Sequence, residues 1–104
     1  MFQLGSALLD GCVLAILLRA DAYGYSLTQE LKSVISVSES TLYPVLRRLQ
    51  KDGLLVTYDQ AFNGRNRRYY RITEAGCARF AVIIAEWEQY KRDVDSIFKG
   101  GTQA

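Results

Sequence analysis

The pattern of hydrophobic and polar positions predicts a buried helix near the start of the chain. Hydrophobic residues follow one another almost without a break at positions 8–18, so we expect a helix that is buried on most sides and forms the centre of the core. Asp21 and Gly24 then mark a turn.

A shorter second helix is predicted after this turn. Leu27 and Leu31 lie four residues apart, as on one face of a helix, and Ser26 and Gln29 are placed as a capping-box pair. The helix should end near residue 32 or 33. The stretch 34–37 then fits either a short strand or a connector.

A third helix is predicted between Ser38, a favourable N-cap, and Gly53, which suits a left-handed stop. Its core positions repeat at i, i+3, i+4 and i+7, and they are Leu42, Val45, Leu46 and Leu49. At about 100° per residue, the opposite side holds Ser40, Pro44, Arg47 and Lys51, with Arg48 nearby and Thr41 and Tyr43 on the flanks. One side of this helix is therefore core and the other is polar.

Pro44 is unusual inside a helix, because it removes one backbone hydrogen bond and its ring crowds the carbonyl of Ser40, at a cost of about 3 kcal/mol. Two interpretations are open. A bent first turn presents Ser40, Thr41 and Tyr43 to a ligand at a particular angle, or Pro44 ends a short turn and the true helix starts later.

A two-stranded hairpin is predicted next. β-Branched and aromatic residues are frequent at 54–58 and 67–72, and Asn63-Gly64 between these segments favours a tight turn. The tip of the hairpin carries Arg65, Arg67 and Arg68, so the hairpin should form a basic wing.

The last helix is predicted at 74–98, capped by Thr73. Its hydrophobic positions form two overlapping stripes, made of Phe80, Ile83, Ile84, Trp87, Tyr90, Val94, Ile97 and Phe98. This is more apolar surface than the rest of the chain offers to cover, so we expect the helix, together with Leu8, to pack against a second copy. We expect residues 100–104 to form a flexible tail.

Charge is unevenly distributed, although the net charge is only +2. Residues 47–71 hold seven cations and two acids, and the remainder holds six cations and nine acids. Positive charge gathered in a short segment indicates a polyanionic partner. A merely solvated face is the alternative.

The residue types exclude several classes of protein. Histidine is absent, which removes the commonest general base and the commonest transition-metal ligand, and no nucleophile or phosphate-loop motif is present. Cys12 and Cys77 are far apart and are interpreted as reduced core thiols rather than as a disulfide or metal ligands. We expect no enzyme activity, cofactor or metal site. The longest hydrophobic run, 12–18, is too short to span a bilayer, so a cytoplasmic protein is expected.

Three short helices, a two-stranded wing and a long C-terminal helix predict a mainly α (α+β) fold, a winged helix-turn-helix followed by a dimerisation helix. STLYPVLRRL at 40–49, followed by KDGL at 51–54, resembles the central signature of PadR-type transcriptional regulators. YGY at 23–25 and the segment from Gly64 to Thr73 agree with it. The resemblance covers about residues 9–97, and the single short C-terminal helix is similar to that of a compact subgroup.

The resemblance implies a homodimeric repressor that reads a palindromic operator in duplex DNA. Residues 1–73 would form the DNA-binding region and 74–99 the dimerisation helix. DNA contacts are expected from one face of the third helix and from the wing, at Ser38, Ser40, Thr41, Tyr43, Pro44, Arg47, Arg48, Lys51, Arg65, Arg67, Arg68 and Tyr69. A winged helix that only mediates protein contacts is the alternative function.

Two groups of aromatic residues have alternative interpretations. In some ligand-responsive PadR-like regulators an aromatic residue near the place of Trp87 lines a pore on the two-fold axis, so a small aromatic or cationic effector is expected there; a buried packing tryptophan is the alternative. Tyr23, Tyr25, Tyr69 and Tyr70 would suit a stacking platform for single-stranded nucleic acid. We favour core and wing packing, because Tyr69 and Tyr70 point to opposite faces of one strand.

Overall fold

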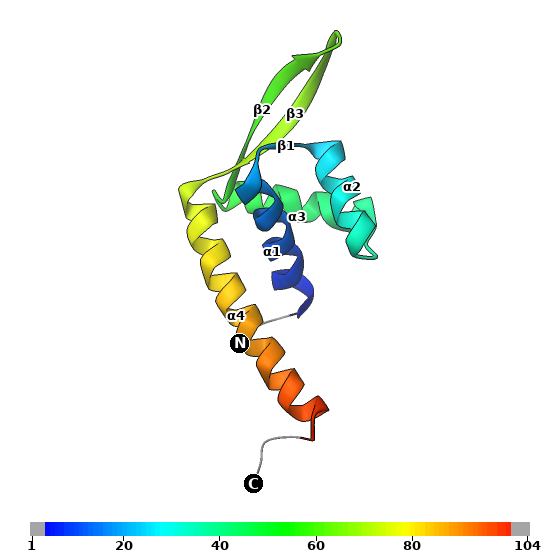
Figure 1. Ribbon diagram of the computed structural model, residues 1–104. Coiled ribbons are helices and arrows are strands. Elements are labelled where there is room, and N and C mark those ends of the chain that lie inside the picture. The colour runs from blue at the N-terminus through cyan, green and yellow to red at the C-terminus, as the bar shows by residue number, and fades with distance from the viewer. Residues whose placement is uncertain (1–3, 101–104) are drawn as a thin grey trace.

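The computed structural model describes residues 4–100 as four helices and a three-stranded sheet (Figure 1). The elements in chain order are α1 (Leu4–Arg19), β1 (Ala22–Tyr23), α2 (Gly24–Val34), α3 (Glu39–Lys51), β2 (Leu55–Phe62), β3 (Arg65–Ile72) and α4 (Glu74–Phe98). The predicted winged helix-turn-helix with a long C-terminal helix is confirmed. All of the predicted tail except Gly100 lies outside the described residues.

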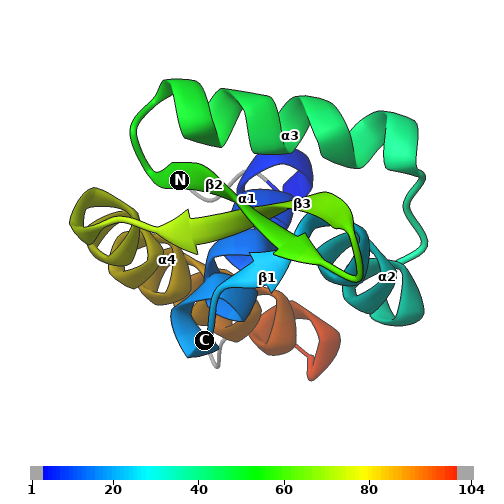
Figure 2. The ribbon, with the colours of Figure 1, turned by 90° about the horizontal axis from the view of Figure 1, so that it is seen from above.

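Helix α1 is the element around which the others pack, as its unbroken hydrophobic run predicts. It contacts α2, α3, α4 and β3, and in Figures 1 and 2 it lies between the other helices. Val13, Leu14 and Leu17 are at most 2% exposed. Around them lie the buried leucines of the other elements, which are Leu27, Leu31, Leu42, Leu46, Leu49, Leu54 and Leu55.

Helix α2 begins earlier than the sequence pattern predicts, and the predicted capping box is wrong. The N-cap is Tyr23, whose side chain accepts no capping hydrogen bond, and Ser26 lies inside the helix. The reason is β1, a strand of two residues in which Tyr23 pairs with Tyr69 of β3. Pairing holds the backbone extended up to Tyr23, so the helix starts at Gly24. Residues 35–38 form a connector and not a strand.

Helix α3 is continuous from Glu39 to Lys51, and Pro44 lies inside it. The interpretation that the true helix starts after Pro44 is therefore wrong. The Oγ of Ser38 accepts a hydrogen bond from the backbone N–H of Thr41 at 3.3 Å, which confirms the predicted N-cap. Gly53 has a φ of 77°, the left-handed conformation expected for the stop.

The wing is longer than predicted. Strands β2 and β3 pair antiparallel from Leu55 opposite Ile72 out to Phe62 opposite Arg65. Asn63 and Gly64 have φ values of 52° and 77°, as in the tight turn that favours this residue pair. The outer half of the hairpin is polar and arginine-rich, so the sequence pattern alone gives it no strand signal.

Helix α4 packs on α1 with its first half and extends past the other elements with its second (Figure 1). The Oγ1 of Thr73 accepts from the N–H of Gly76 at 3.0 Å, so this N-cap is also confirmed. Ile83 is 7% exposed and lies against Gly11 of α1, where an added Cβ would approach the Ile83 side chain to 2.8 Å. Within residues 4–100, no helix has the length and apolar character needed to cross a membrane.

One ion pair joins α1 to α3. Asp10 is buried at 7% exposure, and its carboxylate accepts hydrogen bonds from both terminal nitrogens of Arg48, one of them at 3.2 Å. These bonds raise the pKa of Arg48 above its ordinary value, so its charge is permanent. Arg48 therefore has a partner inside the fold, and a direct contact from Arg48 to DNA stays a prediction.

Arg48→Ala is expected to lower the free energy of unfolding by about 2 kcal/mol, because the Asp10 carboxylate then stays buried without its partner. The matched control is Arg47→Ala, which changes an exposed neighbour that forms no ion pair within residues 4–100 and should alter stability by less than about 0.5 kcal/mol. Urea unfolding of both variants measures the difference. Equal stability of the two would contradict a structural role for the ion pair.

Candidate nucleic-acid interface

The outward side of α3 is polar and exposed, because its leucines are turned into the core. Leu42, Leu46 and Leu49 are at most 1% exposed. The exposed residues among the predicted contacts are Ser38, Ser40, Thr41, Tyr43, Pro44, Arg47, Arg48 and Lys51. The structure thus brings the predicted helix contacts together on one side of α3.

Hydroxyl groups cluster at the first turn of this helix. The Oγ of Ser38 lies 2.9 Å from the Oγ of Ser40 and 3.2 Å from the Oγ1 of Thr41. Each hydroxyl can donate or accept, so the cluster suits phosphate oxygens as well as base edges.

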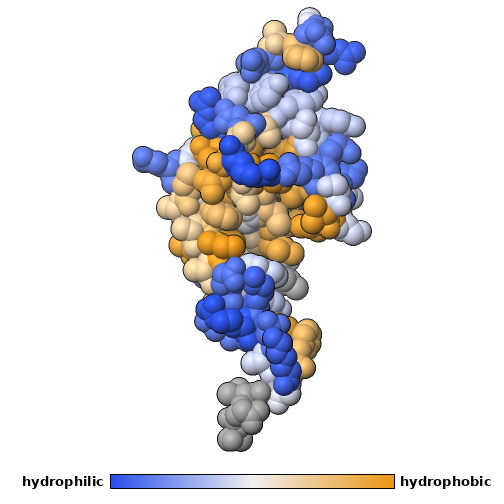
Figure 3. All heavy atoms as spheres, viewed as in Figure 1, coloured by the Kyte–Doolittle hydropathy of each residue, from blue (hydrophilic) through white to orange (hydrophobic). Residues whose placement is uncertain are grey.

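The wing places two of its arginines in solvent. Arg65 and Arg68 are exposed, and Arg68 lies across the hairpin from Asp59, with its Nε 3.7 Å from the carboxylate. That distance is beyond a normal hydrogen bond, and both side chains are more than half exposed, so the pair is weak. In the space-filling view the end of the wing is largely hydrophilic (Figure 3).

Arg67, also predicted as a DNA contact, is held between two aromatic rings. Its guanidinium carbon lies 4.2 Å from the ring centre of Phe62 and 4.6 Å from that of Tyr23. Contacts of this kind are attractive because the ring face is negative. Arg67 is half-buried as a result, and it connects the outer part of the wing to β1.

Three tyrosines continue this column of side chains toward the base of the wing. Tyr69 lies 5.9 Å from Tyr23 and is stacked on Tyr58 at 5.5 Å, measured between ring centres. The Tyr58 hydroxyl donates to Asp21 at 2.7 Å, and Arg71 donates to the same carboxylate at 3.1 Å. Tyr69 is therefore engaged within the wing, which supports the packing interpretation over a platform for single strands.

Tyr70 points to the other side of the sheet, as predicted, and is only 9% exposed. Burial raises the pKa of Tyr70, whereas the charges of Arg68 and Arg47 lower it. Because the net shift is upward, the side chain is a neutral phenol that can donate a hydrogen bond at pH 7.

A cleft of about 580 Å³ lies between α3 and the wing. Its described lining residues are Tyr23, Gly24, Tyr25, Tyr43, Arg47, Gln50, Arg68 and Tyr70, and none of these eight is acidic. Five of them, Tyr23, Gly24, Tyr25, Gln50 and Tyr70, were not among the predicted DNA contacts. The alternation along β3 correctly predicted that Tyr70 lies on the opposite face from Tyr69, but it does not indicate that this face meets α3 and the start of α2.

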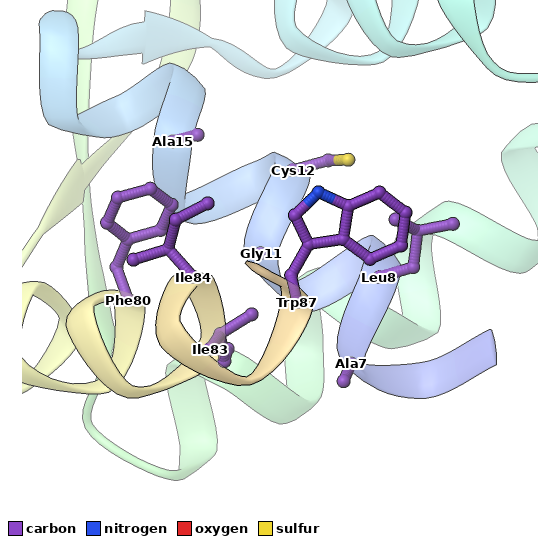
Figure 4. A pocket seen from close by; sticks show the side chains of 9 residues that line it. All are labelled: Ala7, Leu8, Gly11, Cys12, Ala15, Phe80, Ile83, Ile84 and Trp87. Atoms are coloured by element: carbon purple, nitrogen blue, oxygen red, sulfur yellow. The ribbon is translucent and has the colours of Figure 1, made fainter. Parts of the chain in front are cut away.

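A second, apolar pocket of about 290 Å³ lies between α1 and α4 (Figure 4). It is lined by Ala7, Leu8, Gly11, Cys12, Ala15, Phe80, Ile83, Ile84 and Trp87. Trp87 is half-buried and stacks on Tyr90 with the ring centres 6.1 Å apart. Trp87, the residue predicted to contact an effector, thus lines this cavity.

The predicted dimer residues differ in exposure. Ile83 is buried in the core of its own chain. Half-buried residues are Leu8, Phe80, Trp87, Tyr90 and Val94. Ile84, Ile97 and Phe98 are 37%, 72% and 81% exposed, so the uncovered part of the stripe lies mainly at the C-terminal end of α4.

The two cysteines are free, as predicted, but only one of them is partly buried. Burial raises the pKa of the Cys12 thiol and keeps it neutral. Cys77 is exposed, so its prediction as a core thiol is wrong; it lies on the outer side of the first turns of α4. Among the described residues, no group of three or more acidic, cysteine or histidine side chains is placed to hold a metal ion.

Comparison with known proteins identifies the family. Residues 13–82 match the model of the Transcriptional regulator PadR-like family. The chain is 44% identical over 75 residues to the transcriptional regulator Rv3488 of Mycobacterium tuberculosis, which covers 71% of this chain and 70% of that protein.

Solved structures agree over nearly the whole chain. The crystal structure of smu.1704 from Streptococcus mutans UA159 has a TM-score of 0.89 and 38% identity, covering 99% of this chain and 97% of that one. The PadR-like transcriptional regulator BC4206 from Bacillus cereus has a TM-score of 0.80 and 32% identity, with 93% and 97% covered.

These matches confirm the resemblance that the sequence motifs indicate. They also confirm that the chain is not an enzyme, because the family consists of transcriptional regulators. The chain belongs to the PadR-like family of transcriptional regulators, with a winged helix-turn-helix and a single C-terminal helix.

Proposed function

We propose that this chain is a homodimeric repressor that binds a palindromic operator in duplex DNA and is released by a small effector. One observation supports the mode of DNA binding above all others: α3 and the wing line a common cleft without an acidic residue among its described lining. DNA held there contacts both elements at once.

The dimensions and chemistry of α3 suit the major groove. The groove is about 12 Å wide and admits a helix, whose exposed hydroxyl, phenol and guanidinium groups then reach base edges. Tyr43 and Arg47 lie in the middle of the exposed side and are the proposed base-reading residues. Arg65, at the wing turn, is proposed to contact phosphates or the adjacent minor groove.

DNA affinity is expected to fall steeply with salt, with a log–log slope of about −0.9 for each phosphate neutralised. Arg65→Ala should weaken binding to all sequences and reduce this slope. Arg47→Ala should instead reduce the preference for operator over random DNA, since a base contact contributes about 1–3 kcal/mol of discrimination. Fluorescence anisotropy at several salt concentrations, on a duplex selected from random sequences, measures both effects.

A wing variant that changed sequence preference, together with an Arg47 variant that did not, would show that the two elements have the opposite roles. Absence of salt-dependent binding to any duplex would favour the protein-interaction alternative. A selected operator should be a palindrome whose half-sites place the two α3 helices about 34–36 Å apart.

A homodimer is supported by the uncovered apolar residues of α4. Ile84 and Phe98 are fourteen positions apart, close to four helical turns, so they lie on the same side of the helix. That side also carries Phe80 and Trp87, which line the pocket between α1 and α4. Packing this side against the same side of a second copy, related by a two-fold axis, would bury Ile84 and Phe98. The dimer would then present two α3 helices to DNA.

Replacing Ile84 and Phe98 together by Asp is expected to convert the dimer to monomer, because both side chains are exposed and two charges would enter the apolar contact. The control is Val82→Asp. Val82 is 54% exposed on the opposite side of α4, two positions from Ile84, and should leave the dimer intact. Sedimentation velocity of the three proteins tests the interface, and a stable dimer of the double variant would rule out this face.

The α1–α4 pocket is the proposed effector site. Its volume is at the lower end of the range of ligand pockets, and its lining is apolar, which favours a flat aromatic guest over a cation. Lys91 already lies over the Trp87 ring, with its Nζ 5.8 Å from the ring centre, and pairs with Glu88 at 3.1 Å. A guest between α1 and α4 would change the spacing of the two α3 helices in the dimer and so weaken operator binding.

Titration with planar phenolic compounds is expected to quench tryptophan emission, which arises from Trp87 because the chain has one tryptophan. Operator affinity should fall over the same concentration range, and Trp87→Phe, which removes the emission, should shift the midpoint of the affinity loss. Quenching that leaves operator affinity unchanged would show that the pocket is not regulatory, and no quenching by any such compound would assign Trp87 to packing.

A further inference from the structure

One carboxylate at the turn after α1 connects to both strands of the wing. Asp21 lies just before β1, and its Oδ2 accepts hydrogen bonds from the Tyr58 hydroxyl of β2 at 2.7 Å and from the Arg71 Nε of β3 at 3.1 Å. The Arg71 guanidinium also lies over the Tyr58 ring, with its carbon 4.9 Å from the ring centre. The three side chains therefore form a closed triangle in the inner half of the wing.

Backbone pairing alone does not make this connection. β1 is two residues long and pairs with β3, at the edge of the sheet away from β2 (Figures 1 and 2). Tyr58 pairs with Tyr69, and Arg71 pairs with Val56, so Tyr58 and Arg71 are diagonal neighbours on one face of the hairpin. Asp21 thus joins that face of both strands to the turn that leaves α1.

Both donors keep their protons at neutral pH. The hydrogen bond to Asp21 raises the pKa of the Tyr58 phenol, and the hydrogen bond from Arg71 to Asp21 raises the pKa of the guanidinium. The side chains of Asp21 and Arg71 are 32% and 57% exposed, so water screens the attraction between their charges. The triangle therefore fixes an orientation more than it adds stability.

A small tilt in the inner half of the wing becomes a large displacement at its end. Four strand positions separate the Tyr58–Tyr69 pair from the Phe62–Arg65 pair, which is about 14 Å at about 3.4 Å per residue. A tilt of about 15° at Tyr58 would then move Arg65 by about 4 Å. Arg65 would lose a hydrogen bond to a phosphate although nothing at the tip itself had changed.

We propose that Asp21 is a positioning residue for DNA binding: through Tyr58 and Arg71 it sets the angle of the wing to α3 and thereby places Arg65 against the duplex. The assignment rests on the proposed DNA-binding function. It also gives Arg71, a cation of the basic segment 47–71, a role inside the wing instead of at the phosphates.

Asp21→Ala separates this role from simple electrostatics, because the two predict changes of opposite sign. Loss of a negative charge would tighten DNA binding, whereas a misplaced wing weakens it. We expect about a fivefold loss of affinity for operator and random duplex alike, with a salt slope smaller by up to about 0.9 as the Arg65 contact is lost. The control is Glu30→Ala, which removes an exposed acid paired with Arg19 of α1 rather than with the wing, and which should not weaken binding.

A double-mutant cycle shows whether Asp21 acts through Arg65. In the Arg65→Ala background, Asp21→Ala should weaken binding by less than twofold, whereas in the Arg47→Ala background the two losses should multiply. Tyr58→Phe removes one donor and no charge, so it should give a smaller loss with the same dependence on Arg65. It provides a second variant if Asp21→Ala folds poorly.

Residual dipolar couplings of the backbone amides measure the wing angle in the absence of DNA. Couplings at 55–72 and at 39–51 should fit one rigid arrangement in the parent protein, and in Asp21→Ala the wing should fit only after a rotation against α3.

Each outcome decides a separate point. Unchanged couplings in Asp21→Ala, a gain in its affinity, or a loss that persists in full in the Arg65→Ala background would overturn the assignment while duplex binding by the parent protein remained intact. Failure of the parent protein to bind any duplex would overturn the proposed function and with it the role of Asp21 in DNA binding, and the couplings would still show whether Asp21 sets the wing angle.

Discussion

The burial of Leu42, Leu46 and Leu49 against α1 is the contact on which the arrangement of this molecule depends. Three leucines that are at most 1% exposed fix the rotation of α3 about its own axis, and each contributes about 1.5–3 kcal/mol by leaving water. Because the inward side is fixed, the outward side is fixed as well. The same packing explains how Pro44 is accommodated: it lies on the exposed side, where water reaches the Ser40 carbonyl that lacks its helical partner.

The wing depends on a different interaction. A two-stranded ribbon has no core of its own and is marginally stable in isolation. Here the contacts of Arg67 with Phe62 and Tyr23, and the stack of Tyr69 on Tyr58, cover one face of the ribbon from its outer end to its base. Arginine therefore has two roles in the wing: Arg67 stiffens it, whereas Arg65 and Arg68 remain exposed.

Local patterns in the sequence predicted the elements well. The leucine spacing of α3, the caps at Ser38 and Thr73 and the Asn63-Gly64 turn all depend on residues within a few positions of one another, and all are confirmed. The features that were missed depend on partners far away in the chain. Arg48 pairs with Asp10 across 38 positions, and the start of α2 is set by pairing with β3.

The same limit applied to the candidate site. Periodicity identified the polar side of α3 because that side is defined by the helix itself. It did not identify Tyr70, since the cleft exists only where α3, β3 and the start of α2 meet. Nor did it separate Arg67 from Arg68, which are adjacent in sequence but lie on opposite faces of β3 and have different surroundings.

The central claim is that α3 and the wing form one DNA-binding surface and that the far end of α4 is not part of it. The most direct measurement is the change in backbone amide NMR signals of the whole protein on addition of operator duplex. The account predicts changes concentrated at residues 38–51, at 62–68 and at the first turn of α2, with little change at 91–98. Changes centred on α4, with α3 and the wing unaffected, would contradict it.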